Sequence, residues 1–194
     1  MKRLNCDVFM VEGTRLDGNV CITGNFYMEK DCIVTGEIDA GESVILSDND
    51  VVAYVRSETP ENPNKDISYK FMPCLGKNIT AGGDVISGDC CWVGKINAIG
   101  KVLLGENSNS TGIKTESLVH LVSDSCSGDI EAGGDVILEN DISVGNIKSY
   151  GSVSMENNNV TQKIDAQYEV RIKGNAYTGA ITVHNHSFIR FGNK

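Results

Sequence analysis

The chain has 194 residues, of which 40% are hydrophobic and 22% charged, and its formal net charge is -9. This length suits one domain. A surface this acidic repels phosphate groups, which excludes nucleic acid and anionic membranes as expected partners. No run of about 18 apolar residues occurs, so we expect no membrane insertion. Asp7 and Glu12 interrupt the N-terminal stretch, which therefore does not read as a signal peptide.

The chain contains seven cysteines, an odd number, and none are spaced as CxxC. We therefore expect neither a disulfide framework nor a zinc ribbon, and free thiols favour a cytoplasmic location. The adjacent pair Cys90 and Cys91 is a weak candidate for metal binding or redox chemistry, because further ligands at local spacing are missing. No motif indicates a cofactor.

The N-terminal quarter consists of short segments in which every second residue is apolar. Such segments are 20–22 with 26–28, 38–40 with 44–46, and a weaker first copy that contains Leu4, Cys6 and Met10. Alternation of this kind puts one set of side chains inward and the other outward on a β-strand. We therefore predict pairs of short strands joined by turns.

The stretch 56–78 interrupts this pattern and contains all three prolines of the chain, Pro60, Pro63 and Pro73. Proline cannot donate a backbone hydrogen bond and is poorly tolerated in a central strand. We therefore predict that 56–78 is an excursion from the regular structure.

From residue 79 the sequence repeats every 17 residues. The segment IxAGGDVI occurs at 79–86 and again at 130–137, and isoleucines mark the lattice at Ile79, Ile96, Ile113, Ile130, Ile147, Ile164 and Ile181. A small residue usually follows each isoleucine after two positions, a valine after six, and a large apolar residue after eight. Each repeat thus holds two alternating strands, and the glycine pairs 82–83 and 133–134 between them predict left-handed corners.

A repeat this short cannot bury its own apolar side chains, whereas stacked repeats can, because equivalent residues then form ladders. We predict an all-β fold, a single-stranded parallel β-helix (β-solenoid) domain over residues 1–194 with the excursion at 56–78. Its coils should have 17 residues and number about 10–11. The general preference of parallel crossovers favours right-handed winding.

The motif GDIEAGGDVIL (128–138), repeated as KNITAGGDVIS (77–87) and KINAIGKVLL (95–104), resembles bactofilins, which are polymer-forming cytoskeletal proteins. It also resembles the β-helical domains of flagellar-assembly-type polymerising proteins. The resemblance is one of pattern and covers residues 36–55 and 77–190. It implies a right-handed β-helix, end-to-end assembly into filaments and no catalytic residues.

A hexapeptide-like acyltransferase is the alternative from another functional class, and its coils have 18 residues. The third apolar position of each coil in that class is often polar here, as at Ser108, Ser125 and Asn159. Catalysis would need a histidine base. The histidines His120, His184 and His186 read as exposed strand or turn residues, and the HxH pair lacks an adjacent carboxylate or thiol for a metal. We therefore expect no catalytic residue and no metal site, and a protein that is not an enzyme.

Asparagine or aspartate recurs eleven positions after the isoleucines, at Asn107, Asp124, Asp141, Asn158 and Asn175, with Cys90 as the exception. Both residue types tolerate left-handed backbone, so the column predicts stacked corners. Calcium binding is the alternative, but the GGxGxD signature of repeat toxins is absent.

The position seven after each isoleucine should point outward, yet it is apolar in about half of the coils. The predicted interaction stripe is Ile45, Ile86, Leu103, Ile137 and Phe188, with Val11 and Tyr27 at the same phase in the early coils. Apolar stripes usually mark contact surfaces. We hypothesise that 56–78 or a second chain covers this flank. A module that binds an unknown protein partner through the stripe is a third functional alternative.

Neither end of the repeat is followed by a recognisable capping helix, and open coils present unpaired backbone to neighbours. We therefore predict end-to-end contacts through Leu4, Phe188 and Phe191. The resulting hypothesis is a non-enzymatic, self-associating scaffold or cytoskeletal-type structural protein. Its main partner would be itself, as a homo-oligomer or filament.

Overall fold

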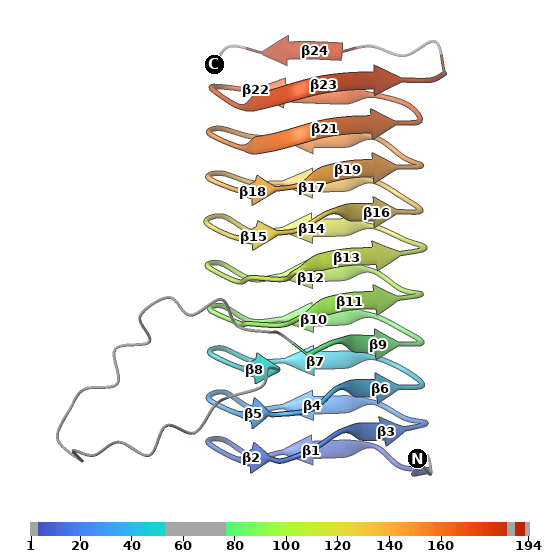
Figure 1. The fold of residues 1–194 in the computed structure, drawn as a ribbon, viewed down its shortest axis with the longest axis vertical. Helices are drawn as coiled ribbons and strands as arrows, with labels where there is room; N and C mark the ends of the chain where they lie inside the picture. Colours follow the sequence, from blue (N-terminus) through green and yellow to red (C-terminus); the bar gives the residue numbers. More distant parts are fainter. Residues whose placement is uncertain (1–3, 53–76, 186–188, 193–194) are drawn as a thin grey trace, which may run out of the picture.

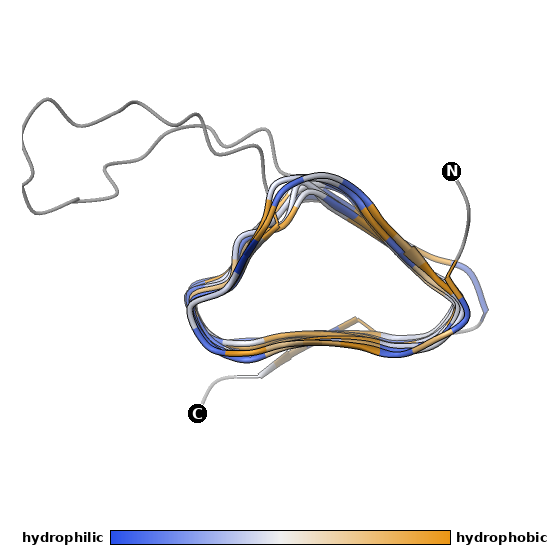
Figure 2. Ribbon diagram, turned by 90° about the horizontal axis from the view of Figure 1, so that it is seen from below, coloured by the Kyte–Doolittle hydropathy of each residue, from blue (hydrophilic) through white to orange (hydrophobic). Residues whose placement is uncertain are grey.

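The structure, a computed structural model, describes residues 4–52, 77–185 and 189–192. These residues contain strands and no helix, and the strands stack in parallel as a β-solenoid of about nine turns (Figure 1). Viewed along its axis the solenoid has a triangular outline with three faces (Figure 2). The predicted fold class is therefore confirmed. The predicted excursion lies outside the described residues except for Lys77 and Asn78.

The first face is a ten-stranded parallel sheet to which each coil contributes one strand. In order its strands are β1 (Val8–Met10), β4 (Phe26–Met28), β7 (Val44–Leu46), β10 (Val85–Ser87), β12 (Val102–Leu104), β14 (Val119–Leu121), β17 (Val136–Leu138), β20 (Val153–Met155), β22 (Val170–Lys173) and β24 (Ile189–Gly192). β1 and β24 are its two edge strands.

The second face is formed by the strands that contain the lattice isoleucines or, in the early coils, Val20 and Ile38 at the same register. They are β3 (Val20–Ile22), β6 (Ile38–Ala40), β9 (Ile79–Ala81), β11 (Lys95–Ala98), β13 (Gly112–Thr115), β16 (Ile130–Ala132), β19 (Asn146–Ser149), β21 (Val160–Ala166) and β23 (Tyr177–Val183). The third face holds β2 (Arg15–Leu16), β5 (Ile33–Val34), β8 (Val51–Val52), β15 (Cys126–Ser127) and β18 (Ser143–Val144). The long strands β21 and β23 span both faces, since β18 also pairs with β21.

The spacing between rungs changes along the rod. Val8 pairs with Phe26, a step of 18 residues, whereas Val85 pairs with Val102, a step of 17. The last step of the first face, from Val170 to Ile189, is 19 residues. The constant spacing of 17 is therefore correct for the middle of the rod, and the end coils are longer.

No described strand lies between β7 and β10 on the first face or between β6 and β9 on the second. Val44 pairs directly with Val85, so the strands before and after the insertion are immediate neighbours. At the base of the insertion the backbone N–H of Lys77 donates to the carbonyl of Val52 over 2.9 Å. The described rungs form about nine turns, compared with the 10–11 coils expected.

The interior consists of ladders of equivalent side chains. The strands of the first face from β4 to β20 bury their first and third residues and leave the middle one half-buried. On the second face the ladder of small residues includes Ala81 and Ala132, which are 2% and 0% exposed. In the same ladder Ser149 Oγ donates to the carbonyl of Gly134 over 2.9 Å. The narrow interior therefore selects small side chains at this position.

The glycine pairs between the two strands are not left-handed corners, contrary to the sequence prediction. Among the described glycines only Gly13, Gly18, Gly112 and Gly174 have positive φ. A Cβ on Gly82 would instead overlap the carbonyl oxygen of Gly41 in the rung below, and one on Gly133 would overlap that of Glu116. Glycine is thus required there because adjacent corners approach closely.

The left-handed corners are formed by asparagine and aspartate, as the sequence predicted. Residues with φ between 55° and 61° are Asp31, Asn49, Cys90, Asn107, Asp124, Asp141 and Asn158. Asn175 was also expected in this column, but Gly174 has the left-handed conformation instead, with φ of 61°. β22 also extends to Lys173, one residue further than β20 extends on the rung below.

The ladder of small residues yields a stability test. We expect Ala132→Leu to lower the free energy of unfolding by about 1–3 kcal/mol, because the added methylenes have no space between adjacent rungs. Thr80→Leu is the matched control at an exposed outward position and should change it by less than about 0.5 kcal/mol. Urea denaturation followed by circular dichroism measures both, and equal stability of the two variants would contradict the packing described.

Candidate functional site: an outer column and two open ends

The outward-pointing residues of the first face form one continuous column along the rod, which we call the outer column. Its members, in register from rung to rung, are Phe9, Tyr27, Ile45, Ile86, Leu103, His120, Ile137, Ser154, Arg171 and Arg190. Ile45, Ile86, Leu103 and Ile137 of the predicted stripe are thus brought together. Arg190 holds the column position that the sequence assigned to Phe188, and Phe188 itself lies outside the described residues.

The outer column is less exposed than an isolated stripe would be. Its members from Tyr27 to Ser154 are half-buried, because each side chain packs against the one above and the one below. Phe9 on the edge strand is 71% exposed and stacks on Tyr27 with ring centroids 4.6 Å apart. Phe9, and not Val11, therefore occupies the outer column in the first coil. Contacts between neighbouring rungs thus account for the half-burial of the outer column, and this half-burial does not by itself indicate a partner chain along this flank.

The chemical character of the outer column changes from one end of the rod to the other. It begins with the Phe9–Tyr27 stack and ends with Arg171 and Arg190. Both guanidinium groups form ion pairs of 3.0 Å with the carboxylate of Glu169. The column is therefore aromatic at the N-terminal end and cationic at the C-terminal end.

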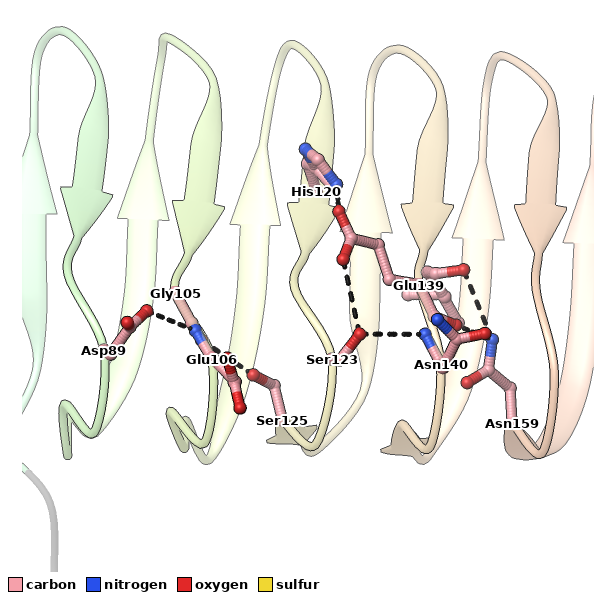
Figure 3. A network of polar contacts seen from close by, with 10 residues as sticks. Asp89, Gly105, Glu106, His120, Ser123, Ser125, Glu139, Asn140 and Asn159 are labelled. Carbon is pink, nitrogen blue, oxygen red and sulfur yellow. Dashed lines mark hydrogen bonds and ion pairs between the residues drawn. The ribbon is translucent and has the colours of Figure 1, made fainter.

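His120 is the polar member in the apolar middle of the outer column. Its Nε2 lies 2.9 Å from Glu139 Oε1, and the Ser123 hydroxyl donates to Glu139 Oε2 over 3.3 Å (Figure 3). The backbone N–H of Asn140 in turn donates to Ser123 Oγ. Glu139 thus lies between the histidine and the serine, so the histidine is not in position to take a proton from Ser123. The cluster ties two neighbouring rungs together.

The C-terminal end exposes residues that belong to core ladders. Ile189 and Phe191 stand above the buried residues Val170 and Ile172, yet they are 44% and 74% exposed. A hollow of about 580 Å³ lies beside them, and it is also lined by Arg171, Lys173 and Arg190. This end is therefore both apolar and cationic.

The N-terminal end also exposes apolar residues. Leu4 bridges to Ile22 at the edge of the second face and is 57% exposed. Phe9 and Leu16 are exposed on the first and third faces. Of the predicted end contacts, Leu4 and Phe191 thus lie at the two opposite ends of the rod.

The two ends differ strongly in charge. Residues 4–52 contain ten acidic and two basic side chains, a net charge of -8. The described residues from Ser143 to Gly192 contain three acidic and five basic side chains, a net charge of +2. The negative charge of the chain is thus concentrated in the first coils, and the rod carries a charge gradient along its axis.

A buried ladder, polar except at Ile142, runs along one interior corner, twelve positions after Val20, Ile38 and the lattice isoleucines from Ile79 to Ile147. It comprises Cys32, Asp50, Cys91, Ser108, Ser125, Ile142 and Asn159. Backbone N–H groups donate to the side chain one rung above, as from Cys91 to Ser108 Oγ over 3.0 Å. The same hydroxyls satisfy carbonyls of the rung below, as Ser125 Oγ does for Gly105 over 2.8 Å (Figure 3). The sequence reasoning recorded only that these positions were not apolar, although their constant spacing marks them as a column.

Asp50 is a fully buried acid within this ladder, at the residue before β8. Its two carboxylate oxygens accept backbone N–H groups from Cys32 and Ser47, each over 2.8 Å. Burial nevertheless raises the pKa of Asp50 to about 6, because desolvation outweighs the two donated hydrogen bonds.

The other candidate ligands found in the sequence do not converge. The Cys91 thiol is buried and donates to the carbonyl of Ser47, and burial raises its pKa to about 12, while Cys90 points to solvent. His184 Nε2 lies 2.7 Å from Asp165 Oδ1, and His186 lies outside the described residues. Within residues 4–52, 77–185 and 189–192, no three His, Cys, Asp or Glu side chains gather where they would hold a metal ion.

Comparison with family models, with curated proteins and with solved structures found no match. Among the described residues, no helix has the length and apolar character that crossing a membrane requires.

The burial of Asp50 predicts a pH-dependent stability. Because folding raises the pKa of Asp50 from 3.8 to about 6, the neutral form is favoured in the folded chain. The resulting stabilisation is present below about pH 4 and is lost as the pH rises through about 6, a change of about 3 kcal/mol. Relative to Asp50→Asn, the wild type should therefore lose stability between pH 4 and pH 8.

Urea unfolding of both proteins across this pH range measures the difference. The substitution also alters the hydrogen bond that the Ser47 backbone N–H donates to residue 50. That cost does not change with pH, so it leaves the slope of the stability difference against pH unaffected. Asp124→Asn, at an exposed carboxylate in another coil, is the control and should follow the wild type. A pH-independent difference between wild type and Asp50→Asn would contradict a buried, titrating Asp50.

Proposed function

We propose that this chain is a non-enzymatic, self-associating scaffold of the cytoskeletal type, whose molecules join through the open ends of the solenoid. The observation that carries the proposal is the exposure of core-ladder residues on the last rung. Phe191 continues the ladder of Ile172 and Leu138 but has nothing stacked on it among the described residues, and it is 74% exposed. Burying an aromatic side chain of this kind contributes about 1.5–3 kcal/mol.

Unpaired strand edges support the same proposal. β24 on the first face and β23 on the second present backbone groups that no described strand accepts. A second solenoid supplies the missing strands, because every face of the rod is already a parallel sheet. The pattern-level resemblance to bactofilins agrees with this use of the ends.

We propose a cytoplasmic location on the chemistry of the cysteines. The six described cysteines form no disulfide with one another, and Cys6, Cys90 and Cys126 are exposed. Exposed thiols persist in a reducing compartment.

We expect Phe191→Asp to abolish the growth of linear oligomers beyond a dimer while leaving the fold intact, because it places a charge in the contact but removes no buried side chain. Tyr168→Asp is the matched control, an exposed aromatic residue on the flank of the rod at 53% exposure. Sedimentation velocity across a concentration series measures association, and circular dichroism with a melting curve verifies folding. Loss of growth beyond a dimer in both variants, or in neither, would contradict an end contact at Phe191.

The acyltransferase alternative stays a prediction of the sequence alone. The 18-residue steps of the first coils match the coil length of that class. Its signature would be a stable trimer of side-by-side solenoids, and the sedimentation experiment separates that species from linear oligomers.

A further inference from the structure

We infer that the junction is head-to-tail, with the C-terminal end of one copy receiving the N-terminal end of the next so that all three faces continue in register. This inference rests on the proposed function and adds the polarity of the contact and the residues that meet. The partner to which it commits is a second copy of this chain. Four independent features of the described residues support it.

The first feature is strand direction. All strand pairs of the first face are parallel, and its edge strands β1 and β24 lie at opposite ends of the rod (Figure 1). A translation along the axis places β1 of the next copy beside β24 as one more parallel strand. Contact between two like ends would instead require antiparallel strands, a pairing that occurs nowhere in the described sheets.

The second feature is charge. Two N-terminal ends in contact would bring together two segments of net charge -8, whereas a head-to-tail contact places this segment against the end of net charge +2. Charges that face each other across such a junction lie within a Debye length of about 8 Å in physiological salt, so they are not screened from one another. Charge therefore favours unlike ends.

The third feature is the outer column. It ends at Arg190 and begins at Phe9, so continuation in register puts the Arg190 guanidinium beside the Phe9 ring of the next copy. Stacked strands are about 4.8 Å apart, which is within the range of about 6 Å for a cation–π contact. Arg190 retains its ion pair with Glu169 in this arrangement.

The fourth feature is a second pair of a cation and an aromatic ring, on the third face. Here the N-terminal end supplies the cation and the C-terminal end supplies the ring. The outward column there begins at Arg15 and ends at Tyr177, which is 68% exposed. Register therefore places Tyr177 of one copy beside Arg15 of the next.

Inside the rod, the ladder of Phe191 continues into Met10 and that of Val183 continues into Leu4. Cations meet aromatic rings and apolar residues meet apolar residues at each of these positions.

The test uses two chains that are each blocked at one end. Phe9→Lys blocks the N-terminal end by placing a cation against Arg190, and Phe191→Asp blocks the C-terminal end by placing an acid against the acidic first coils. Both side chains are more than 70% exposed, so both variants should fold, which circular dichroism verifies. Light scattering after gel filtration measures each variant alone and in an equimolar mixture.

A head-to-tail junction predicts that each variant alone is a monomer and that the mixture forms a 1:1 dimer that grows no further. If each variant alone forms a dimer through its intact end, the junction joins like ends; this overturns the inference and leaves the proposed function standing. If the wild type is also monomeric at every concentration, the proposed function fails and the inference fails with it.

A milder pair of variants tests the residue contact itself. Arg190→Gln should weaken the dimer of the mixture by roughly two- to fivefold, the effect of losing an exposed cation–π contact. Arg171→Gln is the matched control, since Arg171 lies in the same column and pairs with the same Glu169 but stands one rung inside the end. Equal affinities for both variants would overturn the placement of Arg190 against Phe9.

Discussion

The register between rungs is the constraint on which the rest of the structure depends. Because the strands of one face stack in parallel about 4.8 Å apart, each side chain lies next to its equivalent in the adjacent coils. This explains why Ala132 must be small, why glycine is needed at Gly133, and why Asn107 and Asp124 share one backbone conformation. It also explains why, among the described residues, only the first and last rungs have a side without a neighbour.

Side-chain periodicity was sufficient to predict the β-solenoid, because alternation and a fixed spacing are direct consequences of stacked strands. It was not sufficient where the spacing changed. The 19-residue step to Ile189 moved Arg190 into the outer column in place of Phe188, and a count of 17 has no means of detecting two extra residues between strands. The role of glycine at Gly82 was also misassigned, because closeness between corners is a property of the stack and not of one coil.

The polar interior was harder to predict than the apolar one. Ser108 and Ser125 resemble surface residues in composition, yet they are fully buried and satisfy backbone groups that the turn leaves without strand partners. Asp50 occupies the same ladder as an ionisable group, which makes it the position where the interior responds to pH. A constant offset of twelve residues was the available signal, and it distinguishes a ladder from scattered polar residues.

The exposed core ladders, the unpaired strand edges and the opposite charges at the ends all lead to one claim, that the solenoid is a subunit of a linear assembly. Light scattering behind gel filtration on the wild-type chain across a concentration series, followed by negative-stain microscopy of the largest species, tests this claim most directly. The account predicts a mass that rises with concentration and rods of constant width whose length grows. A monomer at every concentration, or a stable trimer of fixed size, would contradict it.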